Sequence, residues 1–308
     1  MQAVALTAFD TPPSLTDLPQ PTPAINEVLV RVHASSVNPV DNGIAAGMLK
    51  QMGVEYDLPV ILGRDYAGVV EQVGADVTRY RVGDKVFGFL LHANPTVHEG
   101  SWAELLTVPE DATIARVPDS VDLAAAGAAP VAGIAAMLSV DALELSKDDS
   151  VLIVGATGGV GSIAVQLAAR AGATVTAPAL LEDEDYLREL GVTEVLPRDS
   201  DLGETAHKTH PHGFDAVLDL VNYTPGVPAN LAKDGGRVAS PTGAAGEGPG
   251  RTMVMAEPTT ANIERLGRLL ADGLHVPIHA SYELSQAPEA LAALASNHTQ
   301  GKLAIRIR

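Results

Sequence analysis

One stretch near the middle of the chain, residues 151–161 (VLIVGATGGVG), constrains the fold more than any other. Its first four residues are apolar, as expected of a strand that is buried on both faces. The glycines that follow permit a tight turn, and residues 159–171 then have the apolar periodicity of a helix. Because a helix N-terminus presents unpaired N–H groups and the positive end of the helix dipole, this turn is predicted to bind a pyrophosphate.

The glycine spacing, GxxGxxG, departs from the usual dinucleotide fingerprint GxGxxG, and a glycine-rich turn can also be a plain connector. The surroundings favour the binding interpretation, since a strand precedes the turn and a helix and a second strand, 173–177, follow it. Together they make a βαβ unit. We therefore predict that the cofactor contacts come from Gly155, Thr157, Gly158, Gly159, Val160 and Gly161.

The pattern of the chain changes near residue 122. Residues 1–121 are predicted to be rich in β-strands, for example at 27–35, 68–74 and 85–91, whereas the chain beyond alternates between strands and helices. Strands are predicted at 151–154, 173–177, 194–196, 216–220, 237–240 and 252–255, and helices at 159–171, 182–190 and 259–272. This alternation predicts a doubly wound parallel sheet in a domain spanning 122–271. Residues 272–308 are predicted to return to the first domain. They should form a strand near 278–284, a helix at 288–296 and a strand at 302–308.

Composition excludes several classes of partner and site. Acidic residues outnumber basic ones by 38 to 20, and the resulting net charge of −18 disfavours nucleic-acid and membrane partners. The absence of cysteine excludes disulfides, thiolate metal sites and a cysteine nucleophile.

The uncharged run 123–140 contains Pro130 and is rich in alanine and glycine, so we expect two packed segments rather than a membrane span. The N-terminus lacks the basic region of a signal peptide, which predicts a cytoplasmic protein.

Several further motifs occur in a fixed order along the chain. They are SVNPVD at 36–41, LGRDYAGVVEQVG at 62–74, VGDKVFG at 82–88, GSWAE at 100–104, GGRV at 235–238 and GKL at 301–303. With the glycine turn, this set resembles the zinc-independent quinone oxidoreductases of the medium-chain dehydrogenase/reductase superfamily. The resemblance implies a GroES-like catalytic domain built from both chain ends, a Rossmann domain, a nicotinamide cofactor between them, and homodimers formed through the Rossmann sheets.

The same comparison predicts that no metal is bound. Zinc-dependent relatives use a Cys and a His as ligands, whereas here the segment 38–41 replaces the Cys and Arg64 stands in place of the His. We expect Arg64 and Asp65 to form a structural ion pair. The histidines at 207, 210 and 212 are expected to lie in a solvated polar loop.

Without a metal, catalysis depends on holding the nicotinamide and the substrate together and on stabilising the developing oxyanion. Asn38 is the leading candidate donor to the substrate carbonyl or the nicotinamide ribose, although it can instead cap the turn at 38–39. Asp41 and Asn42 follow it in the motif, and the Tyr that many relatives carry two positions after this Asp falls on Gly43. His98 is a candidate proton donor near neutral pH.

The residues that should select the cofactor disagree. The Ser and Lys that bind a 2′-phosphate in relatives fall on Leu180 and Glu184, inside the acidic run 182–185. That run is equally suited to the first turn of a helix, and Arg198 can bind a phosphate through two parallel hydrogen bonds. We predict NADPH, with NADH as the alternative, and additional cofactor contacts at Val221, Asn222 and Gly243.

The function predicted from these residues is an NAD(P)H-dependent reductase that transfers hydride to a quinone or an α,β-unsaturated carbonyl. Three polar positions of the family are lost at Gly43, Ala135 and Leu180. Two alternatives therefore stay open. One is a dinucleotide-binding protein without redox turnover, and the other is a non-redox enzyme, such as a natural-product cyclase, on the same fold.

Overall fold

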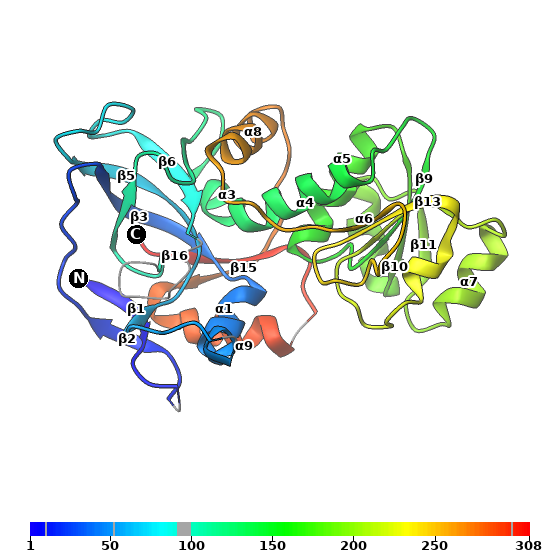
Figure 1. The fold of residues 1–308 in the computed structure, drawn as a ribbon, viewed down its shortest axis with the longest axis horizontal. Coiled ribbons are helices and arrows are strands. Elements are labelled where there is room, and N and C mark those ends of the chain that lie inside the picture. The colour runs from blue at the N-terminus through cyan, green and yellow to red at the C-terminus, as the bar shows by residue number, and fades with distance from the viewer. Residues whose placement is uncertain (10, 52, 91–99, 297) are drawn as a thin grey trace. The chain divides into compact units, whose positions relative to one another are not determined.

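A computed structural model describes residues 1–9, 11–51, 53–90, 100–296 and 298–308 (Figure 1). The chain forms two compact units. The first unit contains Met1–Val131, Pro258–His298 and Lys302–Arg308, and the second contains Ala132–Glu257 and Thr299–Gly301. Both ends of the chain therefore belong to the first unit.

The first unit is built on two sheets. The larger contains β3 (Glu27–Ser36), β5 (Asp65–Val73), β6 (Lys85–Phe89), β7 (Leu105–Pro109), β8 (Ile114–Arg116), β15 (Ile278–Glu283) and β16 (Lys302–Arg306). Its strand order is β15-β16-β3-β5-β6-β8, with β7 paired to β3. The smaller sheet has the order β2-β1-β4 and contains β1 (Gln2–Leu6), β2 (Ser14–Asp17) and β4 (Val60–Ile61). The antiparallel pairing of β16 with β3 joins the C-terminal segment to the N-terminal part of the chain.

Apolar side chains explain why these segments form strands. Alternate residues of β3, Val28, Val30 and Val32, are fully buried in one cluster with Tyr66 and Val86. A second cluster is formed by Val4, Leu6, Leu62, Trp102, Leu303 and Ile305. Helices α1 (Pro39–Ala45), α2 (Met48–Gln51), α3 (Leu123–Ala128), α8 (Thr260–Ala271), α9 (Ala287–Ser296) and the short η3 (Leu284–Gln286) complete the unit. The strands and the helix predicted for the C-terminal segment are confirmed.

The second unit contains the predicted parallel sheet. Its strands are β9 (Ser150–Val154), β10 (Thr174–Ala179), β11 (Glu194–Pro197), β12 (Phe214–Asp219), β13 (Ala232–Ser240) and β14 (Arg251–Met253), in the order β11-β10-β9-β12-β13-β14. All of these pairs are parallel. Its helices are α4 (Pro130–Ala142), α5 (Gly159–Arg170), α6 (Glu184–Leu190) and α7 (Leu202–Thr209), with short turns η1 (Leu181–Asp183) and η2 (Pro228–Leu231). Figure 1 shows α5 and α7 on opposite sides of the sheet. This is the doubly wound Rossmann arrangement, and the predicted fold class is confirmed.

Three features differ from the sequence predictions. Helix α8, which we placed in the 122–271 domain, belongs to the first unit because it packs on β8 and its Thr260 hydroxyl donates to the Ala112 carbonyl at 3.0 Å. His207 lies on helix α7, not in a loop. His210 is partly buried, with its Nε2 atom 2.6 Å from Glu194 Oε2 and its ring against Phe214, so the prediction of a solvated surface residue is wrong for it.

The uncharged run 123–140 forms α3 and most of α4, in agreement with the expectation of two packed segments. Across the part of the chain that the structure describes, no helix combines the length and the apolar character that crossing a bilayer requires.

Candidate active site

The glycine turn lies where the strand order of the parallel sheet reverses. β9 pairs with both β10 and β12, and ligands of doubly wound sheets bind at the carboxyl ends of strands at such a point. Gly155 ends β9 with φ of 86°, a backbone conformation that favours glycine. A Cβ on Gly161 would lie 2.1 Å from the Gly155 carbonyl oxygen, so the close approach of α5 to β9 requires glycine there.

Gly158 differs from Gly161 in what surrounds it. It is the N-cap residue of α5, and a Cβ built on it would meet only the Gly155 carbonyl oxygen, at 3.7 Å. The packing of the protein therefore does not need glycine at this position, and the absence of a side chain leaves room for a ligand at the helix N-terminus. The bare backbone between Gly155 and Gly161 fits a pyrophosphate, as the sequence predicts.

A second turn follows β12 beside the glycine turn. The Leu220 N–H donates to the Val154 carbonyl at 3.1 Å, and a Cβ on Gly155 would lie 2.7 Å from Val221 Cγ1. Asp219 holds this turn, because its Oδ1 accepts from the N–H groups of Val221 at 3.0 Å and Asn222 at 2.9 Å. The structure thus brings the predicted cofactor residues Val221 and Asn222 next to Gly155.

Two acceptors of this second turn have no partner among the described residues. They are Asp219 Oδ2 and Asn222 Oδ1, both buried. Asn222 also has φ of 54°, an uncommon conformation for a residue other than glycine. Buried acceptors without partners suit ligand hydroxyl groups such as those of a ribose. Asp219 is not predictable from the sequence, since nothing in its local pattern distinguishes it from any aspartate at the end of a strand.

The two remaining predicted cofactor residues are less constrained. Gly243, after β13, has φ of 81° and nothing within 4 Å of a Cβ built on it. Arg198, after β11, is exposed, and its guanidinium carbon lies 5.7 Å from the centre of the Tyr223 ring. Leu181 and Tyr223 are themselves 86% and 71% exposed. This surface is open to a ligand.

The C-terminal segment 299–301 reaches the glycine turn within the second unit. Gly301 forms a parallel bridge with Gly158, and its N–H donates to the Thr157 carbonyl at 2.7 Å. Gln300 Nε2 donates to Oδ1 of the buried Asp183 at 2.9 Å. Backbone contacts with Gly301 therefore hold the glycine turn at Thr157 and Gly158.

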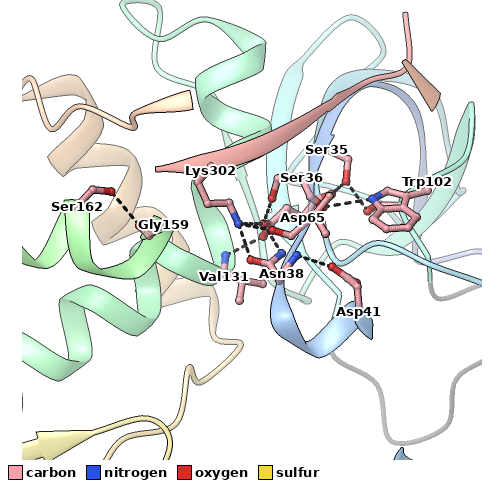
Figure 2. Close-up of polar contacts among 12 residues, drawn as sticks. Ser35, Ser36, Asn38, Asp41, Asp65, Trp102, Val131, Gly159, Ser162 and Lys302 are labelled. Carbon is pink, nitrogen blue, oxygen red and sulfur yellow. Dashed lines mark hydrogen bonds and ion pairs between the residues drawn. The ribbon is translucent and has the colours of Figure 1, made fainter. Parts of the chain in front are cut away.

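In the first unit, Asp65 is the centre of a buried polar cluster (Figure 2). Its Oδ2 accepts from Ser36 Oγ at 2.5 Å and from Asn38 Nδ2 at 2.8 Å, and it lies 3.6 Å from Lys302 Nζ. Its Oδ1 accepts from the Val131 N–H at 2.7 Å. The expected ion pair of Arg64 with Asp65 is replaced by this pair with Lys302, because β16 carries Lys302 to the end of β3.

Lys302 and Asn38 are joined directly. Lys302 Nζ donates to Asn38 Oδ1 at 2.5 Å and to the Val37 carbonyl at 3.1 Å. Burial lowers the pKa of Lys302, and the neighbouring carboxylates of Asp65 and Asp41 oppose that shift. Lys302 belongs to the GKL motif at 301–303, and this motif was the available signal for a role that the sequence analysis did not assign.

Asp41 is buried completely in the first turn of α1. Its Oδ2 accepts from the Asn38 N–H at 2.8 Å, and its Oδ1 has no partner among the described residues. Burial raises the pKa of Asp41 to about 7, and Asp65 adds to the rise, while Arg64, the Asn38 N–H and Lys302 act in the opposite direction. A carboxyl group of this kind is largely protonated below neutral pH.

The remaining predicted catalytic residues separate from this cluster. Asn42 Nδ2 donates to the Leu291 carbonyl at 3.3 Å, which ties α1 to α9. His98 lies outside the residues that the structure describes. Among the described positions no group of three or more His, Asp and Glu side chains is arranged to hold a metal ion.

Comparison with known proteins places this site in a family. Residues 24–119 match the alcohol dehydrogenase GroES-like domain and residues 190–305 the zinc-binding dehydrogenase domain. The chain is 32% identical to a chloroplast envelope quinone oxidoreductase homolog of Arabidopsis thaliana, over 94% of this chain and 92% of that protein. It is 30% identical to the chloroplastic NADPH-dependent alkenal/one oxidoreductase of the same plant, over 91% of this chain and 72% of that protein.

A solved structure supports the same assignment. The quinone oxidoreductase of Coxiella burnetii superposes with a TM-score of 0.89 at 29% identity, over 100% of this chain and 99% of that chain. Fold, glycine turn and sequence together define a member of the medium-chain dehydrogenase/reductase superfamily. Within that superfamily the chain belongs to the quinone oxidoreductase family, and it is an NAD(P)H-dependent oxidoreductase.

Proposed function

We propose that this protein is a zinc-independent reductase that transfers hydride from NADPH to a quinone or an α,β-unsaturated carbonyl compound. The observation that carries the proposal is the glycine turn, where Gly158 leaves the N-terminus of α5 open although the packing of the protein does not require glycine there. The names of the two Arabidopsis thaliana relatives support the substrate class.

The nicotinamide cofactor, when bound, supplies the hydride, and the protein supplies position and hydrogen bonds. Backbone N–H groups of the turn bind the pyrophosphate, and the unpartnered acceptors of Asp219 and Asn222 bind ribose hydroxyls. The residues assigned to cofactor binding are Gly155, Thr157, Gly158, Gly159, Val160, Gly161, Arg198, Val221, Asn222 and Gly243, to which Asp219 is added.

In the first unit, Asn38 is assigned as the donor to the substrate oxygen, which becomes negative as hydride arrives. Asp41 fixes the backbone of Asn38 through the hydrogen bond to its N–H, and Asn42 anchors the helix that carries both residues. His98 stays a predicted proton donor.

The chemistry of the cluster supports the proposal of zinc independence. A catalytic zinc ion requires Cys, His or carboxylate ligands around an open position. Asn38 is engaged with Lys302 and Asp65, the ammonium of Lys302 already neutralises Asp65, and Arg64 adds a second buried cation. We expect prolonged dialysis against a chelator to leave turnover unchanged, and a loss of activity restored by zinc would contradict this assignment.

The activity is tested with purified protein and a panel of small quinones and enones, following oxidation of NADPH and NADH by absorbance. We expect turnover with at least one acceptor and a lower Kd for NADPH than for NADH by cofactor fluorescence. Tight cofactor binding without oxidation by any acceptor would instead support a binding protein without redox turnover. No dinucleotide binding at all would favour a non-redox enzyme.

We further propose that the protein is a cytoplasmic homodimer that pairs through its Rossmann sheets. The edge strand β14 supports this assembly, since Met253 on this strand and Met255 just after it are each 63% exposed. Light scattering for the mass, and fractionation of the producing cells for the location, test the two statements.

A further inference from the structure

Asn38 has two chemically different ends, and a substrate oxygen can be stabilised by only one of them. An asparagine side chain presents either a carbonyl oxygen, which accepts, or an NH2 group, which donates. The proposed role requires the NH2 end to face the substrate. The side chain must therefore be held against rotation by 180°, which would exchange the two ends.

The partners of Asn38 permit one orientation. Lys302 carries only donors at Nζ, and it contacts Asn38 Oδ1 at 2.5 Å. The Asp65 carboxylate carries only acceptors, and its Oδ2 receives a hydrogen bond from Asn38 Nδ2 at 2.8 Å. The rotated side chain would place the amide NH2 against the ammonium and the amide oxygen against the carboxylate, so both contacts would become repulsive.

Asp65 and Lys302 are engaged with other groups of the cluster. Asp65 accepts from Ser36, Asn38 and the Val131 N–H and lies beside Lys302. Lys302 Nζ donates to the Val37 carbonyl and to Asn38 Oδ1, and it lies 3.6 Å from Asp65 Oδ2. Among the described contacts, the second N–H of the Asn38 amide is the donor left over.

We infer that Lys302 and Asp65 are positioning residues. They hold the Asn38 side chain in the orientation in which its NH2 group, not its carbonyl oxygen, faces the substrate oxygen. The inference rests on the proposed function, in which that oxygen gains negative charge during hydride transfer. Neither Lys302 nor Asp65 contacts the substrate in this scheme, because both act through the Asn38 side chain. Orienting a third side chain in this way gives a role to a buried ion pair whose lysine is only 4% exposed.

The sharpest test exchanges the amide and the carboxylate in the double variant Asn38→Asp/Asp65→Asn. The double variant still has one carboxylate beside Lys302 and one amide that can donate to this carboxylate. We therefore expect its melting temperature to stay close to that of the natural protein. The N–H donor at position 38 is lost. We expect kcat to fall by about 100-fold with KM and cofactor Kd within about threefold, the pattern of an interaction made in the transition state.

A pair of single variants provides an independent test if the double variant does not fold. Lys302→Gln and Lys302→Met both remove the charge at similar size, but only the glutamine amide can still donate to Asn38 Oδ1. We expect Lys302→Gln to retain most of kcat and Lys302→Met to lose at least tenfold more. Ser36→Ala is the control, because it removes a hydrogen bond to Asp65 without freeing the Asn38 amide.

The outcomes separate the inference from the proposed function. Full kcat in the folded double variant, or equal losses in the two Lys302 variants, would overturn the inference while the reductase assignment stands. A natural protein that oxidises no cofactor with any acceptor would overturn the proposed function instead. In that case the inference is tested by binding of the oxyanion 4-nitrophenolate. We expect the natural protein to bind it at least tenfold more tightly than the double variant. Equal affinities, or no binding to either protein, would overturn the inference.

Discussion

At the scale of single residues, Asp41 links the site to the stability of the first unit. Its folded-state pKa of about 7 exceeds the ordinary value of 3.8, because burial penalises the carboxylate. Between about pH 4 and pH 7 the unfolded chain is ionised at this position while the folded chain keeps the proton, so stability falls as the pH rises through this window. A shift of about three pKa units corresponds to a cost on the order of 4 kcal/mol once the pH exceeds 7.

The variant Asp41→Asn should remove this cost. The asparagine oxygen can still accept from the Asn38 N–H, and the side chain does not ionise. We expect the variant to gain stability relative to the natural protein between pH 5 and pH 8, measured by urea unfolding of both proteins at each pH. Asp17→Asn, at an exposed position, is the control and should not change the pH slope. Parallel slopes for the natural protein and Asp41→Asn would contradict the prediction.

At the same scale, Arg198 is the residue that we propose selects NADPH. It is the exposed cation nearest in sequence to the end of β11, and it lies over the Tyr223 ring, whereas the positions at Leu180 and Glu184 offer a phosphate no cation. We expect Arg198→Ala to raise the Kd for NADPH by about tenfold through loss of a charged hydrogen bond. The Kd for NADH should change less than twofold, so fluorescence titration of both cofactors is the measurement. Equal changes for the two cofactors would show that Arg198 does not contact the 2′-phosphate.

At the scale of elements, two glycines of the same turn have different roles. Gly161 is required by the packing of α5, whereas we propose that Gly158 is required only by the cofactor. A Cβ at Gly161 would collide with the backbone of Gly155 and Ala156 at 2.1 and 2.6 Å, so Gly161→Ala should displace α5 and lower the melting temperature strongly. Gly158→Ala has room within the protein, since the nearest atom would be 3.7 Å away. We expect this variant to keep its melting temperature and to bind NADPH at least tenfold more weakly.

The two glycine variants are compared by thermal unfolding and by cofactor titration. Each serves as the control for the other, because both add a single methyl group to the same turn. If Gly158→Ala bound NADPH normally, the cofactor would not approach the N-terminus of α5, and the proposed function would lose its main support.

Periodicity explains which elements were predictable. The buried strands of the parallel sheet and helix α5 have apolar patterns, and all six strands were predicted, although β13 begins at Ala232, five residues before its predicted start. Helix α7 was missed because the segment LGETAHKT is mostly polar, with one buried alanine, Ala206. Its start was nevertheless encoded, since Asp201 accepts from the Glu204 N–H at 2.8 Å and the spacing Asp-x-x-Glu is a helix-start signal.

Residues of the site were predictable from the sequence only where they lie together in one short motif. Asn38 and Asp41 lie three residues apart and were identified together, and the glycine turn is likewise continuous in sequence. The contact of Lys302 with Asn38 spans 264 residues, so no local pattern could pair them. The partner of Asp65 was wrongly expected to be its neighbour Arg64 for the same reason, because sequence proximity was the only information available about pairing.

At the scale of the whole molecule, the net charge of −18 acts against self-association. Two such chains repel each other, so a dimer requires local contacts strong enough to overcome the repulsion. Strand β14 lies at the edge of the sheet and carries the exposed Met253, and an edge strand of this kind can pair with another chain. Because salt screens charge repulsion beyond about 10 Å at 0.1 M, we expect the proposed dimer to be tighter in moderate salt than in dilute buffer.

The variant Met253→Lys places a positive charge at that edge and should shift the protein from dimer to monomer. A lysine on the strand would lie against its copy across the dimer axis, and like charges in such a pair are destabilising. Light scattering should give twice 31.8 kDa for the natural protein and 31.8 kDa for the variant at the same concentration. Met48→Lys, at an exposed position of the first unit, is the control and should remain dimeric. Since the glycine turn lies within one chain, the monomeric variant should still bind NADPH with unchanged affinity. If the Met253→Lys protein stayed dimeric, the dimer interface would lie on another surface.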